Sequence, residues 1–218
     1  MTAIEQAQQL IDRLNSTKPN LTQIRAIAKE CGKNQEAADY LWQHGGTSAR
    51  LLSLLILDLK AINPGTIERM IADIEAAEPQ DQRQLSDWLI ANVIMKKSAL
   101  KNAAMQWRSE PSIIKQRVFW SMQARTIKAD NHELNAQLLE ALETDMAGAD
   151  ERVQEPMNWC AAQIGIEDEQ LRGRCMQLGE RLGLYKDYPV SKGCTSPYLP
   201  IWIEAMVGRR ELDAANNL

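Results

Sequence analysis

A run of cations is the feature of this sequence most suited to binding a charged ligand. Between Lys96 and Lys128 the chain carries eight lysines and arginines and one acid, Glu110, although its formal net charge is −4. Polyanion binding depends on local charge density more than on net charge. The run therefore predicts a surface that contacts a phosphate backbone, and a solvated basic helix face is the alternative.

Tryptophan is the second residue type that suggests chemistry, since the chain has six Trp and one Phe. The face of an indole ring attracts cations and packs against sugars. Trp42, Trp107 and Trp120 lie in apolar stripes at helical spacing, which predicts that they are core residues. Trp88 is either a further core residue or part of a binding surface, and Trp159 is a candidate for a binding surface.

The potential metal ligands are scattered. The four cysteines form no C-x-x-C pair, and the chain has two histidines, His44 and His132. This spacing predicts no structural zinc site and no metal. Cys160 and Cys175 are predicted to be small buried residues, and free thiols are typical of a reducing cytoplasm.

The N-terminal residues MTAIEQAQQLIDRL are polar and acidic, whereas a signal peptide needs a basic flank and an apolar run. No window approaches the roughly 18 apolar residues of a membrane span. The sequence thus predicts a cytoplasmic protein that does not contact membranes.

The elements that must position these residues are predicted to be helices. Apolar residues recur at helical spacing, and no stretch alternates as a strand would. Asn20 is a predicted N-cap, Thr47 or Ser48 another, and Asn63-Pro64-Gly65 opens a further helix. The predicted helices span residues 21–30, 34–43, 49–59, 66–77, 79–95, 98–108, 111–126, 133–146, 151–164 and 168–182.

Helix pairs recur every 30 to 40 residues or so, which is the scale of HEAT and armadillo repeats. The prediction is an all-α fold, a curved α-solenoid of HEAT-like antiparallel helix pairs, and a compact irregular bundle is the alternative. Residues 1–218 are predicted to form one domain. Residues 184–200, rich in Pro and Tyr, are predicted to form an irregular loop within it.

Several segments together resemble a known family. They are IRAIAKECGKNQEAADYLWQHGGTSARLLSLLILD, LSDWLIANVIMKK, KQRVFW, VQEPMNWCAAQIG and KDYPVSKGCTSPY. Their order and spacing, over about residues 20 to 207, resemble the DNA alkylation repair family of AlkD-type alkylpurine DNA glycosylases. The resemblance implies a HEAT-like solenoid whose concave basic surface binds double-stranded DNA. It also implies excision of cationic N3- or N7-alkylated purines without metal or cofactor.

The family's site combines a Trp-Asp-x-x-Asp pattern, an arginine in the next helix pair and a tryptophan in the pair after that. Carried over residue by residue, the resemblance gives Trp88 the place of the first tryptophan, Arg117 that of the arginine and Trp159 that of the later tryptophan. The candidate phosphate contacts within the basic run are Lys96, Lys97, Lys101, Lys115, Arg117 and Arg125.

One position departs from the family pattern. The carboxylate expected four residues after the first tryptophan is Asn92, a neutral amide of nearly the same shape. Asp87 and Asp81 are the nearest acids, but neither lies on the matching helical face. Asn92 is therefore the candidate catalytic position, with its chemistry weakened.

The reaction itself explains why this matters. A purine alkylated at N3 or N7 is already a cationic leaving group, so cleavage of its bond to the sugar mainly needs stabilisation of positive charge on the sugar. A carboxylate provides that charge, whereas an amide provides only a dipole. Two functions therefore stay open: a DNA glycosylase with slow chemistry, or a non-catalytic helical scaffold that binds nucleic acid or protein.

Overall fold

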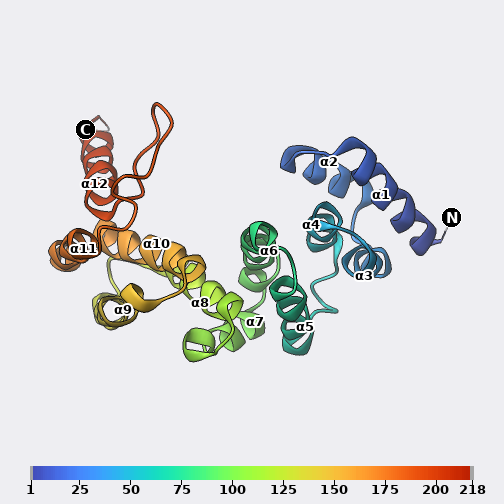
Figure 1. The fold of residues 1–218 in the computed structure, drawn as a ribbon, viewed down its shortest axis with the longest axis horizontal. Coiled ribbons are helices and arrows are strands. Elements are labelled where there is room, and N and C mark those ends of the chain that lie inside the picture. The colour runs from blue at the N-terminus through green and yellow to red at the C-terminus, as the bar shows by residue number, and fades with distance from the viewer. Residues whose placement is uncertain (1, 217–218) are drawn as a thin grey trace. The chain divides into compact units, whose positions relative to one another are not determined.

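The computed structural model describes residues 2–216, and every regular element among them is a helix. Residues 1, 217 and 218 of the predicted domain lie outside the described residues. The helices up to α11 follow one another with short connections, and a longer irregular segment joins α11 to α12 (Figure 1). Their bounds are α1 (Ala3–Thr17), α2 (Leu21–Cys31), α3 (Gln35–His44), α4 (Thr47–Ile56), α5 (Pro64–Glu75), α6 (Pro79–Asn92), η1 (Ile94–Lys96), α7 (Ser98–Ala104), η2 (Trp107–Ser109), α8 (Ile113–Thr126), α9 (His132–Asp145), η3 (Met146–Gly148), α10 (Glu151–Glu167), α11 (Glu169–Leu182) and α12 (Leu199–Asn216). The all-α prediction is confirmed.

The chain divides into two compact units, one ending at Val118 and the other beginning at Phe119. The boundary falls inside α8, so this helix contributes residues to both units. That residues 1–218 act as one domain, and that the helix stack is curved, stay predictions.

In the first unit, helices pack on their sequence neighbours and also on the next helix but one. α3 packs against α4, while α1 contacts α3, α2 contacts α4 and α4 contacts α6. Such second-neighbour contacts stack helix pairs in layers, as in repeat proteins. Leu41, Leu52, Ile74 and Leu89 are fully buried between these layers.

In the second unit, α10, α11 and α12 all pack against one another. α11 approaches α12 closely at Gly179, where an added Cβ atom would lie 2.5 Å from Cβ of Leu199. A larger side chain there would force the helices apart, because cores are close-packed. Cys160 and Cys175 are fully buried in this unit, which confirms their predicted role.

Asparagine caps begin three helices of the first unit. The side chains of Asn20, Asn34 and Asn63 each accept a hydrogen bond from the backbone N–H three residues later. These bonds satisfy amide groups that a helix start leaves without partners. The cap predicted at Asn20 is confirmed. The helix predicted to open with Asn63-Pro64-Gly65 is present, but it begins at Pro64 rather than residue 66.

Other helix boundaries differ from the prediction. α4 begins at Thr47 with Gly46 as its N-cap and no side-chain cap, so neither Thr47 nor Ser48 has the predicted role. α6 ends at Asn92 rather than residue 95, although Val93 and Ile94 beyond it are buried. Because the apolar pattern continues past the helix end, periodicity alone overestimates its length.

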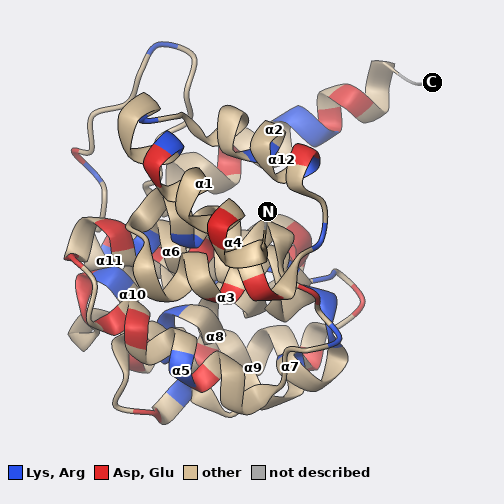
Figure 2. Cartoon of the chain, turned by 90° about the vertical axis from the view of Figure 1, so that its right-hand side faces the viewer, with Lys and Arg blue, Asp and Glu red and all other residues tan. Residues whose placement is uncertain are grey.

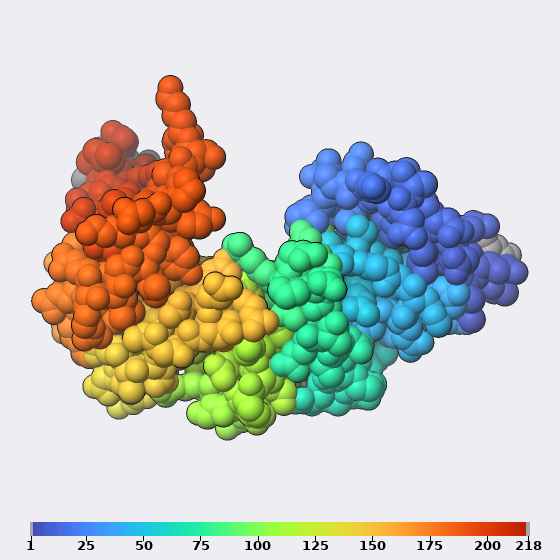
Figure 3. Space-filling model, viewed as in Figure 1, coloured from blue at the N-terminus to red at the C-terminus, as the bar shows by residue number. Residues whose placement is uncertain are grey.

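The segment between α11 and α12, residues 183–198, contains no helix or strand, and part of it projects from the rest of the second unit (Figure 3). Tyr188 and Val190 are exposed there. The side-chain amide of Asn158 donates to the carbonyl oxygen of Pro197 at 2.9 Å and ties the end of the segment to α10. The irregular stretch ends before residue 200, because Pro200 is accommodated in the first turn of α12.

Among residues 2–216, no helix combines the length and the apolar character needed to cross a membrane. The three tryptophans predicted to be core residues, Trp42, Trp107 and Trp120, are buried, so this prediction is confirmed.

Candidate nucleic-acid interface

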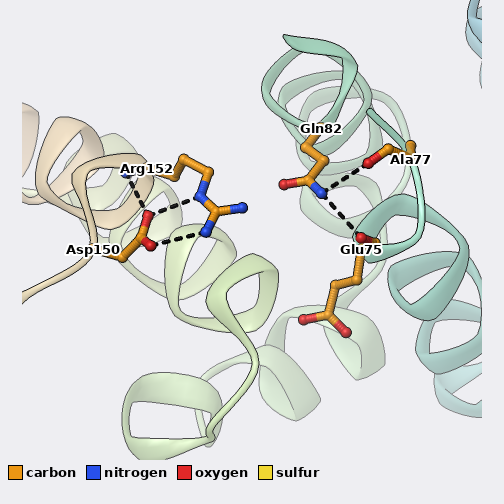
Figure 4. A network of polar contacts seen from close by, with 5 residues as sticks. All are labelled: Glu75, Ala77, Gln82, Asp150 and Arg152. Carbon is orange, nitrogen blue, oxygen red and sulfur yellow. Dashed lines mark hydrogen bonds and ion pairs between the residues drawn. The ribbon is translucent and has the colours of Figure 1, made fainter. Parts of the chain in front are cut away.

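The helix that carries Trp88 and Asn92 is α6, and its start is fixed by polar contacts. Pro79 occupies the first turn, where its missing N–H costs no hydrogen bond. The side-chain amide of Gln82 donates to the carbonyl oxygens of Glu75 and Ala77, both at 3.0 Å (Figure 4). These bonds hold the connection between α5 and α6 and so orient the α6 helix.

Trp88 is buried, with 7% of its surface exposed. One helical turn later, the side-chain nitrogen of Asn92 donates a hydrogen bond to the carbonyl oxygen of Trp88 at 2.9 Å. Position 92 therefore holds no negative charge, and one N–H of its side-chain amide donates to the backbone of its own helix.

Arg117, the predicted arginine of the site, reaches α6 from α8. Its Nε donates to the hydroxyl of Ser86 at 3.0 Å, and a terminal nitrogen lies 2.9 Å from a carboxylate oxygen of Asp87. Arg117 is only 3% exposed, whereas the Asp87 side chain is 38% exposed. The structure thus brings Arg117 to α6, where it contacts Ser86 and Asp87, the two residues that precede Trp88 in sequence, and it pairs the nearest acid with this arginine.

Trp159 belongs to the second unit and lies on α10, which contains Pro156 in its interior. The guanidinium carbon of Arg125 lies 4.5 Å from the centroid of the Trp159 ring. This distance is typical of a cation–π contact. The predicted residues Arg125 and Trp159 are therefore neighbours within this unit.

The start of α10 is stabilised by an ion pair. Asp150 accepts hydrogen bonds from Nε and a terminal nitrogen of Arg152, both at 2.8 Å, and from its backbone N–H (Figure 4). The side-chain hydrogen bond from Arg152 lowers the pKa of Asp150 below its ordinary value. This two-pronged geometry makes the pair more directional than a single contact.

Two lysines of the predicted basic surface already have partners. Nζ of Lys97 donates to the carbonyl oxygens of Leu59 and Ile62, at 3.3 and 2.6 Å. Nζ of Lys115 lies 2.8 Å from Glu68 on α5, a helix that carries both acidic and basic residues (Figure 2). The hydrogen bond to Glu68 raises the pKa of Lys115.

The other two candidate lysines are differently placed. Lys96 is exposed and Lys101 partly exposed, and neither side chain forms an ion pair or hydrogen bond with the residues that the structure describes. Of the four predicted lysines, these two are therefore the ones available to a phosphate.

Arg25 is a residue that the sequence pattern did not single out. It lies on α2 in the first unit, and its guanidinium carbon is 4.7 Å from the centroid of the Trp88 ring. Nothing local identifies it, because its aromatic partner lies more than 60 positions further along the chain. Only the fold brings the two side chains together.

Within the described residues, no group of three or more His, Cys, Asp or Glu side chains is arranged to hold a metal ion. The two buried thiols of the second unit are kept protonated by burial, which raises the pKa of Cys175 to about 12 and also raises the pKa of Cys160. Neither cysteine is arranged as a nucleophile or as a ligand.

Comparison with known proteins agrees with this fold. A solved structure described as "a new family of proteins related to the HEAT-like repeat DNA glycosylases with affinity for branched DNA structures" matches with a TM-score of 0.62 and 18% identity. The match covers 97% of this chain and 89% of the other, and it confirms the HEAT-like fold class. No curated protein sequence matches the chain. Residues 19–177 match the family described as "DNA alkylation repair enzyme". By this match over most of its length, the chain belongs to the DNA alkylation repair family.

Proposed function

We propose that this protein binds double-stranded DNA and excises cationic N3- or N7-alkylated purines slowly. The family match and the basic run at residues 96–128 support DNA binding. Slow excision is supported by Asn92, which replaces the carboxylate of the family pattern with a neutral amide bonded to the Trp88 carbonyl.

The missing negative charge at position 92 determines how much slower base excision should be. A preorganised electrostatic group is worth about 10² to 10³ in rate, because it stabilises charge that develops only in the transition state. Without that group, the tendency of the cationic purine to leave supplies most of the remaining reactivity.

Single-turnover release of 7-methylguanine from a duplex tests this proposal directly. We expect slow release by the wild type and faster release by Asn92→Asp, with DNA affinity nearly unchanged. Asn92→Ala is the matched control, because it removes the amide without adding charge. The aspartate introduced at position 92 lacks the neighbouring contacts that would position it, so it should recover only part of the excision rate. Fast release by the wild type that Asn92→Asp leaves unchanged would contradict the proposal.

A second function, DNA binding without catalysis, is favoured by the position of Arg25 over Trp88. A cation already occupies one face of the ring that the family resemblance assigns to a cationic base, and like charges repel. The structural relative is described as having affinity for branched DNA. Under this alternative, neither the wild type nor Asn92→Asp releases base, while linear duplex or a four-way junction is bound.

A further inference from the structure

The contact between Arg25 and Trp88 joins an exposed cation to a buried ring. Arg25 is exposed on α2, whereas Trp88 on α6 is buried, and 4.7 Å separates the guanidinium carbon from the ring centroid. The guanidinium of Arg25 forms no hydrogen bond or ion pair with the residues that the structure describes. Its N–H donors thus have no protein acceptor while the ring restricts its position.

The surroundings of Arg25 favour an anionic ligand. From Lys18 to Lys33 the chain carries four cations and one acid, Glu30. The carboxylate of Glu30 lies 3.3 Å from Arg13 on α1, so that charge is already matched. The positive charge of Arg25 is therefore not balanced by an acid on its own helix.

An arginine held on an aromatic face suits phosphate better than a free arginine does. A guanidinium presents planar donors that match phosphate oxygens, and restricting it in advance reduces the entropy lost on binding. A cationic purine on the same ring face would have to displace Arg25. The contact therefore selects for the anionic backbone of DNA over a cationic base.

From these contacts we infer that Arg25 binds a backbone phosphate of DNA and that Trp88 is the platform that holds it. This inference rests on the proposed DNA binding and assigns a contact outside the basic run at residues 96–128. Arg25 is then a binding residue, and Trp88 is a positioning residue that acts through it.

Equilibrium binding to an undamaged duplex at several salt concentrations tests the assignment. We expect Arg25→Ala to weaken binding about 3- to 10-fold near 0.1 M salt and to reduce the salt slope by about 0.9, the value of one phosphate contact. Arg25→Lys keeps the charge but loses the planar group, so it should fall between the wild type and Arg25→Ala.

Arg69→Ala is the matched control, because Arg69 is an exposed arginine of the same unit, on α5, and contacts no aromatic ring among residues 2–216. The inference predicts less than a 2-fold change for this variant. Equal effects of Arg25→Ala and Arg69→Ala, in a wild type that binds duplex, would overturn the role of Arg25 and leave the proposed function standing. A wild type that binds no duplex would overturn both.

Because Arg25 is exposed, its removal should hardly affect folding. A cation–π contact made by an exposed side chain contributes little to the stability of the fold, so the thermal midpoint should shift little. A large loss of stability together with an unchanged salt slope would mean that the contact is structural, and it would also overturn the inference.

Discussion

The side-chain nitrogen of Asn92 donates a hydrogen bond to the backbone carbonyl oxygen of Trp88, 2.9 Å away and one turn earlier on α6. This bond ties the candidate catalytic position to the candidate binding position. It also explains how a neutral residue is accommodated where the family pattern has an acid.

The same bond predicts a cost for restoring the acid. An ionised aspartate at position 92 cannot donate to the Trp88 carbonyl and places negative charge beside that oxygen. We expect Asn92→Asp to lower the free energy of unfolding by about 0.5–1.5 kcal/mol, measured by urea denaturation at pH 7. Asn92→Ala should cost less, since it adds no charge. Equal stability of Asn92→Asp and wild type would show that the bond contributes nothing.

The ion pair between Arg117 and Asp87 predicts that Asp87 is structural. Arg117 is nearly fully buried, so the loss of the Asp87 carboxylate removes negative charge from beside a buried cation. We expect Asp87→Asn to lower the free energy of unfolding by about 1.5–3 kcal/mol. Asp81→Asn, a control on the first turn of the same helix, should cost less than about 1 kcal/mol. Similar values for the two variants would contradict this role.

We expect the four candidate lysines to separate into two that bind DNA and two that stabilise the fold. Lys96 and Lys101 have no protein partner within residues 2–216, so replacing both with Ala should reduce the salt slope of duplex binding by nearly two units. Lys97 donates a hydrogen bond to a backbone carbonyl oxygen, and Lys115 forms an ion pair with Glu68. Replacing these two lysines should therefore mainly lower the free energy of unfolding. If the salt slope changed only when Lys97 and Lys115 were replaced, Lys96 and Lys101 would not contact the DNA, and the prediction would be wrong.

Asp168, the N-cap of α11, predicts a pH-dependent stability of the second unit. Burial raises its pKa, but hydrogen bonds from His132 and Asn135 outweigh burial and hold the pKa below the ordinary value. The unfolded chain therefore binds the proton first as the pH falls. The stability from this group is complete above about pH 4, the ordinary Asp value, and is lost as the pH falls through the folded pKa.

Unfolding by urea between about pH 6 and about pH 2.5 measures this contribution. Asp168→Asn keeps a residue that caps helices well. It should reduce the acid limb, which is the fall in the free energy of unfolding as the pH is lowered. Asp187→Asn, in the irregular segment 183–198, is the control and should leave the limb unchanged. An acid limb that persists in Asp168→Asn would contradict the prediction.

Local features of the fold could be read from the sequence, and long-range contacts could not. The caps at Asn20 and Asn63, and the burial of Trp42, follow from residue type and helical spacing. The end of α6 was misjudged because Val93 and Ile94 continue the apolar pattern as buried residues outside the helix. The spacing of apolar residues indicates which face of a helix is buried, but it does not indicate where the backbone hydrogen bonds of the helix end.

The site shows the same division. The family resemblance proposes Trp88, Arg117 and Trp159 as candidate site residues from their order, but it does not give the partners that surround them. Arg25 contacts Trp88 across 63 positions, and Lys97 reaches carbonyl groups 35 and 38 positions earlier. Because helix packing sets these pairs, a count of charges along the chain overestimates how many lysines are available to DNA.

Binding of the wild-type protein to an undamaged duplex, followed from about 50 to about 200 mM salt, tests the central claim most directly. The claim is that this member of the DNA alkylation repair family binds the DNA backbone through exposed cations. We predict saturable binding whose logarithm falls linearly with the logarithm of salt concentration, with a slope of about −0.9 for each phosphate contact. Affinity that does not change with salt, or no binding at about 50 mM salt, would contradict it.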